Sequence, residues 1–169
     1  MSAYLSRLIR IQPTLNPRIT PFTSAIRRQS TMSSPPTVTK TATCLCGSVS
    51  FTSTGVDKGS VLCHCSNCQK FGGGPFMHNT RLIQAENKFT RGEEILKKYE
   101  DRDTKNGNVL ERYFCGNCGS PMMFKSPNTP GLVVLQSGTL QEQQQPRFEL
   151  YGENRHGWIP DLTAKKAKM

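Results

Sequence analysis

This 169-residue sequence contains no apolar run long enough to cross a bilayer, and it has no acidic residue before Asp57. A membrane-spanning helix needs roughly 20 apolar residues, so the first absence excludes one, and no membrane partner is expected. The sequence also lacks an internal repeat and a long amphipathic helical pattern. A chain of this length has room for one domain with an appended tail.

Because no acidic residue precedes Asp57, positive charge is concentrated at the N-terminal end of the chain. The formal net charge is +10, and six of the 22 basic residues lie before residue 41: Arg7, Arg10, Arg18, Arg27, Arg28 and Lys40. The remaining 16 basic residues compare with 12 acidic ones, and three of the 16 are lysines within residues 163–169, which are expected to form a basic, disordered tail. The positive charge therefore says more about targeting than about a polynucleotide, and nucleic-acid binding is not expected.

Residues 1–36 have the composition of a targeting leader. They are rich in Arg, Ser and Thr, and their apolar residues fall at helical spacing between arginines. This is typical of a mitochondrial transit peptide, which predicts import into the matrix; a merely disordered basic tail is the alternative. Met32, which is followed by Ser33-Ser34-Pro35-Pro36, is a second possible start that would leave a cytosolic form. The folded domain is expected at residues 37–162.

Cysteine occurs in an odd number, seven, and in tight clusters. The clusters are Cys44-Leu45-Cys46, Cys63-His64-Cys65-Ser66-Asn67-Cys68 and Cys115-Gly116-Asn117-Cys118. Such spacings do not suit ordinary disulfides, so the pattern favours zinc over disulfides or an iron–sulfur cluster. Zinc prefers four tetrahedral ligands, and the two outer pairs supply four while the central segment supplies three. We predict two zinc ions per chain, one that staples the fold and one, on Cys63, Cys65 and Cys68, that keeps a position for a substrate.

The open coordination position on the second zinc indicates activation of a substrate thiol. A thiol with a pKa of about 8.5 is mostly protonated at neutral pH, whereas the thiolate is the nucleophile. Zinc on three thiolates is a weaker electrophile than zinc on three imidazoles, but it can still bind and deprotonate a fourth thiol. We expect a substrate sulfur there, which attacks a small carbonyl carbon or undergoes the reverse carbon–sulfur cleavage.

Alternation with a period of two predicts a mostly antiparallel β fold in which zinc pins loops at one end. Strands are expected at residues 37–43, 47–52, 60–62, 75–83, 88–91, 95–99, 109–114, 122–124, 132–136 and 147–151. Turns are expected at residues 57–60 and, with a hairpin-type Asn106-Gly107, at residues 101–108. One helical turn through Gln69–Phe71 should end at Gly72-Gly73-Gly74-Pro75. This glycine segment either lets backbone approach the open zinc or is a flexible connector.

Three motifs in this order and spacing point to a known family: CLCGSVSF at 44–51, CHCSNCQKFGGGPF at 63–76 and YFCGNCGSPM at 113–122. The sequence resembles the glutathione-dependent formaldehyde-activating (Gfa) and centromere-protein-V-like family of zinc proteins over roughly residues 40–160. The resemblance implies a β-tent fold of stacked antiparallel sheets with few short helices. It also implies a structural zinc on Cys44, Cys46, Cys115 and Cys118 and a catalytic-type zinc on Cys63, Cys65 and Cys68.

The resemblance further implies condensation of glutathione with formaldehyde to S-(hydroxymethyl)glutathione, a carbon–sulfur lyase activity in reverse. The alternative is a binding or architectural protein in which both zincs are structural. Residues 141–169 are Gln-rich and Lys-tailed and depart from the family, so we predict no substrate contact in them.

Further side chains near the motifs have two interpretations each. The cations are a rim for the glutathione carboxylates or solvated surface charges: Lys70, Arg81 and Arg112. The aromatic residues are expected in the core rather than on a substrate wall: Phe71, Phe76 and Trp158. His64 is expected to project away from the metal. His78 is expected to be a strand residue, unless it is a fourth ligand or a general acid. His156 is expected on the surface.

Overall fold

A computed structural model describes residues 36–163, and the predicted leader and basic tail lie almost wholly outside them. The elements in chain order are β1 (Thr37–Thr43), β2 (Ser50–Cys63), α1 (Ser66–Gly72), β3 (Met77–Arg91), β4 (Leu96–Asp101), β5 (Leu110–Cys115), β6 (Pro121–Lys125), β7 (Val133–Gln136), the 3-10 turn η1 (Ser137–Thr139), β8 (Phe148–Leu150) and the 3-10 turn η2 (Gly152–Asn154). The predicted mainly β architecture with little helix is confirmed. No helix in the described part of the chain is long and apolar enough to cross a membrane.

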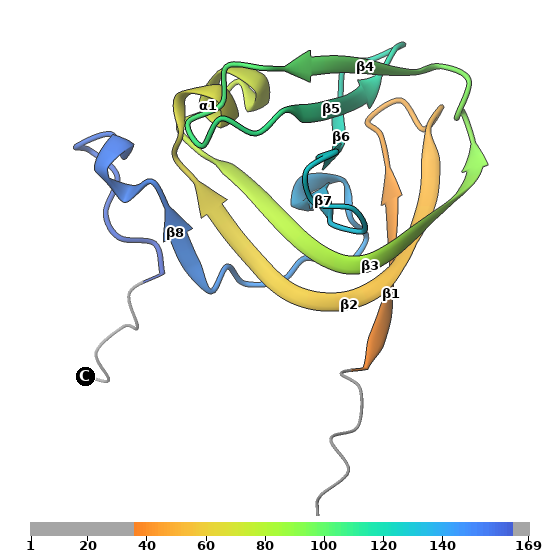
Figure 1. The fold of residues 1–169 in the computed structure, drawn as a ribbon, viewed down its shortest axis with the longest axis horizontal. Coiled ribbons are helices and arrows are strands. Elements are labelled where there is room, and N and C mark those ends of the chain that lie inside the picture. The colour runs from red at the N-terminus through yellow and green to blue at the C-terminus, as the bar shows by residue number, and fades with distance from the viewer. Residues whose placement is uncertain (1–35, 164–169) are drawn as a thin grey trace, which may run out of the picture. The chain divides into compact units, whose positions relative to one another are not determined.

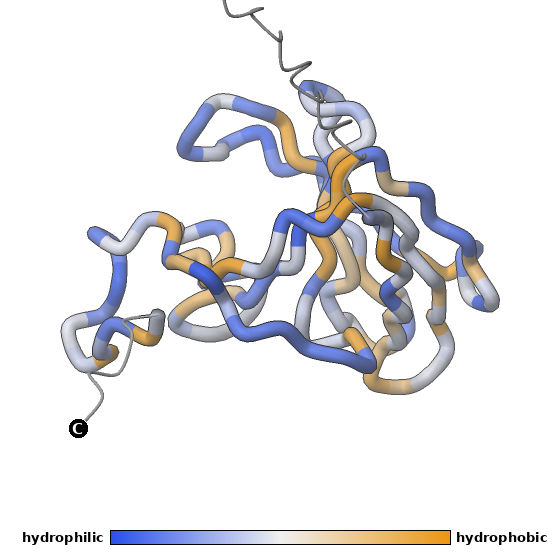
Figure 2. Tube along the Cα trace, turned by 90° about the horizontal axis from the view of Figure 1, so that it is seen from below, coloured by the Kyte–Doolittle hydropathy of each residue, from blue (hydrophilic) through white to orange (hydrophobic). Residues whose placement is uncertain are grey.

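The strands form one hydrogen-bonded path in the order β1-β2-β3-β7-β6-β5-β4. Neighbours on this path are antiparallel, whereas β8 pairs in parallel with the end of β2. Figure 1 shows β2 and β3 bending together beneath β4, β5 and β6, so that distant parts of the same sheet face each other. Short hydrophobic and hydrophilic stretches alternate along the trace, and no long hydrophobic run interrupts this pattern in the described residues (Figure 2).

Strands β2 and β3 are longer than predicted. The expected turn at residues 57–60 is a bulge inside β2, where the Gly59 amide donates to Asp57 Oδ1 at 2.6 Å and the register with β3 shifts. The expected strands 75–83 and 88–91 are one strand, interrupted only by Gln84 at φ 51°. A bulge inserts extra residues without ending the pairing, so turn-like composition did not end either strand.

Two hydrophobic clusters fill the interior. The larger one surrounds Phe51, Leu82, Met122 and Leu135, all fully buried, and the Phe51 ring packs on Phe89 with centroids 5.1 Å apart. Ala42 of β1 pairs with Phe51 of β2, and both belong to this cluster, whereas residues 59–63 at the end of β2 are buried at every position. The smaller cluster contains Cys63, Cys68, Met77 and Phe124, so part of the core is built on cysteines.

Candidate metal centres

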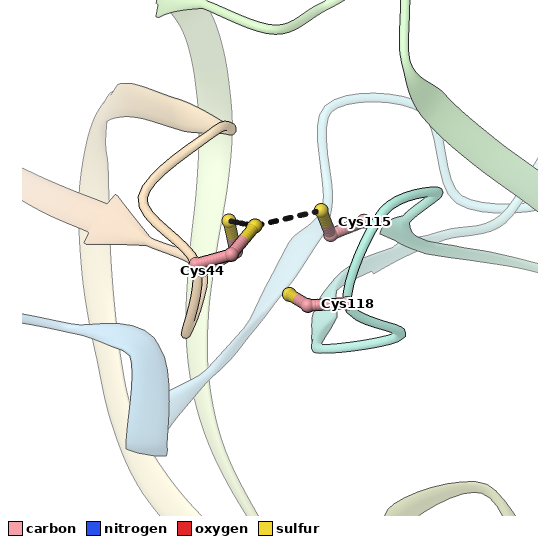
Figure 3. Close-up of side chains that lie close together, drawn as sticks. Cys44, Cys115 and Cys118 are labelled. Atoms are coloured by element: carbon pink, nitrogen blue, oxygen red, sulfur yellow. Dashed lines mark hydrogen bonds between the residues drawn. The ribbon is translucent and has the colours of Figure 1, made fainter.

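The four-sulfur cluster, Cys44, Cys46, Cys115 and Cys118, joins two distant loops. Cys44 and Cys46 follow β1, whereas Cys115 ends β5 and Cys118 lies in the turn before β6. Their sulfur atoms all lie within 4.8 Å of one another. Figure 3 shows the sulfurs of Cys44, Cys115 and Cys118 pointing into the same space.

The sulfur spacing fits zinc and not disulfides. Cys46 Sγ lies 3.5 Å from Cys44 Sγ and 3.8 Å from Cys115 Sγ. A tetrahedron with zinc–sulfur bonds of about 2.3 Å has sulfur–sulfur edges of about 3.8 Å, whereas a disulfide bond is about 2.05 Å. All seven cysteines are free. The predicted set of four thus comes together with the dimensions of a structural zinc site.

Donors around the four-sulfur cluster favour thiolates. The Val49 amide donates to Cys44 Sγ at 3.2 Å, and Asn117 Nδ2 donates to Cys46 Sγ at 3.4 Å. Hydrogen bonds with the Ser48 side chain and backbone, and with Asn117, lower the pKa of Cys46 to about 5. Burial raises the pKa of Cys115 to about 11, so this thiol in particular needs a cation to ionise.

The three-sulfur cluster, Cys63, Cys65 and Cys68, forms where β2 turns into α1. Cys63 ends β2, Cys65 is the N-cap of α1 and accepts from the Cys68 amide at 3.4 Å, and Cys68 lies in the first turn. The Cys63 and Cys65 sulfurs are 3.5 Å apart, and all three lie within 4.8 Å of one another. The short strand, the helical turn and the glycine stop predicted from the sequence therefore bring these sulfurs together.

Hydrogen bonds among the three thiols shift their pKa values in opposite directions. The Cys63 and Cys68 thiols hydrogen-bond to Cys65 and lower its pKa to about 2. Hydrogen bonds with Cys63 and Cys65, together with burial, raise the pKa of Cys68 far above its usual range. Hydrogen bonding to Cys65 raises the pKa of Cys63 to about 11. Zinc binds cysteines as thiolates, so a divalent ion bound here would displace the thiol protons.

The histidines lie away from both clusters' sulfurs. His64 is fully buried, and its Nε2 lies 2.8 Å from Glu149 Oε2, so it projects away from the cysteines as predicted. His78 is a half-buried strand residue whose pKa is lowered by burial, although the Gln144 backbone opposes this. Neither belongs to a group of metal-ligand atoms among residues 36–163, which leaves the three-sulfur cluster without a histidine ligand there.

Trp158 and Arg112 contradict their expected environments. Trp158, expected in the core, is 75% exposed and stacks on the exposed His156. Trp158 lies in the C-terminal segment, where no described strand covers its ring. Phe71 packs against the three-sulfur cluster as a half-buried side chain, in line with the core interpretation. Arg112 is only 2% exposed and is not a solvated surface charge.

Arg112 can be buried because its guanidinium group has an ion-pair partner and two aromatic rings around it, and only one of its nitrogen atoms lacks a hydrogen bond. Its Nε and Nη2 lie 2.8 and 2.6 Å from Asp101 Oδ2, and its guanidinium lies over the rings of Phe71 and Phe124. Its Nη1 is buried with no hydrogen-bond partner. Asp101 also accepts from Asn67 Nδ2, at 3.0 and 2.9 Å. This network ties the cysteine-bearing helix to β4 and β5.

The other predicted cations do not converge with Arg112. Lys70 is exposed at the end of α1, as expected of a surface charge. Arg81 donates to the Lys58 carbonyl at 2.9 Å and covers the Phe148 ring. A shared cationic rim made of these three residues is therefore not what the structure shows.

Sequence reasoning missed the contribution of residues 146–162 to the three-sulfur cluster. The half-buried Tyr151 packs against that cluster, and burial followed by the charges of Cys63 and Cys65 raises its pKa. Glu149 reaches His64 from the same segment. The Gln-rich composition concealed this return of the chain, and only the alternation of polar and apolar residues at 147–151 predicted a strand.

Comparison with known proteins agrees with this site. The family model for the glutathione-dependent formaldehyde-activating enzyme matches residues 39–154, which include all seven cysteines. The chain belongs to this family. At family level, the match supports a glutathione-related, formaldehyde-activating role and a small thiol substrate.

A solved structure is also similar to this chain. It is a crystal structure of a Rhodobacter sphaeroides protein, with a TM-score of 0.46 and 19% identity, and the match covers 62% of this chain and 90% of that one. The search of curated proteins found no significant match.

Proposed function

We propose that this protein is a zinc-dependent enzyme of the carbon–sulfur lyase type, which forms or cleaves S-(hydroxymethyl)glutathione. The observation that carries the proposal is the unequal division of the cysteines. One cluster offers four sulfurs, and the other offers three, with no further His, Cys, Asp or Glu atom joining it among residues 36–163. A structural zinc site is closed by four protein ligands, whereas a catalytic site keeps one position for substrate.

Cys63, Cys65 and Cys68 would hold the catalytic-type zinc, and Cys44, Cys46, Cys115 and Cys118 the structural one. Zinc on three thiolates supplies a position where a fourth sulfur binds in its deprotonated, nucleophilic form. This is the chemistry that addition of a thiol to an aldehyde needs.

The residues around the three-sulfur cluster suit this role. Phe71 and Phe124 pack against the cysteines and against each other, with ring centroids 5.7 Å apart, and give the cluster an apolar side. Arg112 places a positive charge near Cys65, and this charge lowers the thiol's pKa in addition to the hydrogen bonds from Cys63 and Cys68. A cluster of three thiolates on a divalent ion carries a net negative charge, so a nearby guanidinium stabilises it.

Cobalt substitution tests the proposal. Glutathione added to the cobalt-loaded protein should change the sulfur-to-cobalt charge-transfer bands, whereas the glutathione analogue with a methyl group in place of the thiol should not. Cys68→Ser should abolish the response, and Tyr99→Phe, at an exposed side chain outside both clusters, is the control and should respond as the native protein does. An unchanged spectrum in the native protein would favour the rival interpretation, a binding or architectural protein with two structural zincs.

We also propose a mitochondrial location for the form that begins at Met1. The support is the composition of residues 1–36, which lie almost wholly outside the described part of the chain. Cell fractionation with N-terminal sequencing of the mature protein tests it. A mature protein in the matrix that starts after an Arg-rich leader is expected, and an uncleaved protein found only in the cytosol would contradict it.

A further inference from the structure

Tyr151 has a backbone conformation that requires an explanation. It is the N-cap of η2 and has φ 56° and ψ 45°, the left-handed region. Among residues 36–163, it and Gln84 are the only residues other than glycine with positive φ. Such a conformation is unfavourable for a residue with a bulky side chain, and it persists only where the surroundings impose it.

The chain on the N-terminal side of Tyr151 is fastened to the segment that carries the three-sulfur cluster. The His64 amide donates to the Leu150 carbonyl at 3.0 Å, and His64 Nε2 lies 2.8 Å from Glu149 Oε2. His64 stands between two of the cysteines. The strand β8 is thus tied to the cluster by one backbone and one side-chain contact.

The C-terminal side is fastened as well. Gln69 Nε2, next to Cys68 in the sequence, donates to the Asn154 carbonyl at 3.3 Å. Lys105 Nζ lies 4.9 Å from the centre of the Tyr151 ring and 2.6 Å from Glu153 Oε1. Contacts on both sides therefore hold the strained residue in place against the cysteines.

The Tyr151 side chain brings an unpartnered hydroxyl to this site. The ring packs against the cluster formed by Cys63, Cys68, Met77 and Phe124. Within residues 36–163 its hydroxyl makes no hydrogen bond, whereas the half-buried Tyr113 donates to Glu111 at 2.9 Å. The hydroxyl is not among the buried polar atoms that lack a partner, so it is open to solvent and available to a ligand.

We propose that the Tyr151 hydroxyl donates a hydrogen bond to the oxygen of the substrate aldehyde, and to the same oxygen in the hydroxymethyl product. This inference rests on the proposed function. In the addition, the sulfur lone pair forms the carbon–sulfur bond and the carbonyl π pair moves to oxygen. The proton lost by the substrate thiol ends on that oxygen. Tyr151 keeps its own proton and stabilises the charge that develops on oxygen.

The test is Tyr151→Phe, which keeps the ring and removes only the hydroxyl. We expect kcat/KM for adduct formation to fall by about tenfold to a hundredfold, because a donor to a developing oxyanion is lost. Metal content and the glutathione-induced change in the cobalt spectrum should stay at native values. Tyr99→Phe, which removes a 59% exposed hydroxyl, is the matched control and should have native activity.

A second readout does not depend on turnover. In protein labelled with 13Cζ-tyrosine, the Tyr151 resonance, assigned by its loss in Tyr151→Phe, should shift when formaldehyde is added to the glutathione-bound protein. The Tyr99 resonance should stay in place. A Tyr151 resonance that does not respond, or native kinetics in Tyr151→Phe, would overturn the assignment.

The remaining outcomes are also decisive. Loss of metal or of glutathione binding in Tyr151→Phe would show a structural role for the hydroxyl and would overturn the inference. If the cobalt spectrum of the native protein does not change when glutathione is added, the proposed function is contradicted, and this inference is contradicted with it. A native spectrum that responds while Tyr151→Phe is fully active leaves the proposed function standing and removes only Tyr151.

Discussion

Arg112 shows how single residues support the three-sulfur cluster from a distance. Its guanidinium is buried, pairs with Asp101 and lies over two aromatic rings. Asp101 in turn accepts from Asn67, which stands between Cys65 and Cys68. Buried charges are tolerated only when they are paired and hydrogen-bonded, so each member of this network depends on the others.

Arg112→Met should therefore destabilise the metal-loaded protein. The substitution keeps the apolar contact with Phe71 but leaves the Asp101 carboxylate without its buried cation, which costs about 3 to 5 kcal/mol in the free energy of unfolding. Urea unfolding followed by circular dichroism measures it. Arg102→Met, at a 72% exposed side chain that pairs with Glu100, is the control and should leave the midpoint unchanged. Equal midpoints for both variants would contradict the network's role.

At this scale the sequence identified the two cysteine clusters that could hold metal ions but not the residues that support them. Cysteines at short spacing are informative because neighbouring residues must face one ion. Asp101, Glu149 and Tyr151 reach the same site from remote segments of the chain, and no local pattern marks them. Arg112 was named as a candidate, but its burial depends on partners that only the fold brings together.

Among the elements, α1 sets the geometry of the three-sulfur cluster. Its N-cap is Cys65, and it ends at Gly73, whose φ of 66° is left-handed and whose amide donates to the Gln69 carbonyl. The helix thus begins with one cysteine of the cluster, carries another, and stops at a residue that suits a left-handed C-cap.

Gly73→Ala should lower the free energy of unfolding by about 1 kcal/mol, because a Cβ is unfavourable at this φ although no atom lies within 4 Å to clash with it. Gly74→Ala is the matched control, since Gly74 does not have a left-handed φ and its nearest contact would be 3.7 Å away. Thermal unfolding compares the two. If Gly74→Ala were the more damaging change, close approach of the backbone rather than helix termination would be what the glycine segment provides.

The helices and strands were largely predictable where short-range sequence patterns determine them. The helical turn, its glycine stop and most strands follow from period and turn residues. The bulges inside β2 and β3 could not be told from turns, because Asp57 and Gly59 are equally suited to both. The parallel pairing of β8 depends on the return of a Gln-rich segment to β2, which alternation does not encode.

For the whole molecule, a metal ion bound by the four-sulfur cluster would act as a cross-link between the two ends of the sheet path. Cys44 and Cys46 follow β1, at one end, and Cys115 and Cys118 border β5, near the other. A cross-link between residues so distant in sequence restricts the unfolded chain and secures the curved sheet.

Cys115→Ser and Cys68→Ser should therefore differ. The first substitution should prevent cooperative folding or lower Tm strongly, because metal binding at the structural site is coupled to folding. The second should keep the strands and their cooperative unfolding while removing the second metal. Calorimetry with metal analysis compares them, and a fold that is equally damaged by both changes would show that the clusters share one structural role.

The central claim is that the second zinc has a position for an external sulfur. X-ray absorption at the zinc edge measures the mean number of sulfur neighbours per ion in the two-zinc protein. With seven cysteine sulfurs shared between two ions we expect roughly 3.5, rising to roughly 4 when glutathione is added. A mean that does not change with glutathione, or two ions already saturated by protein side chains, would contradict the account.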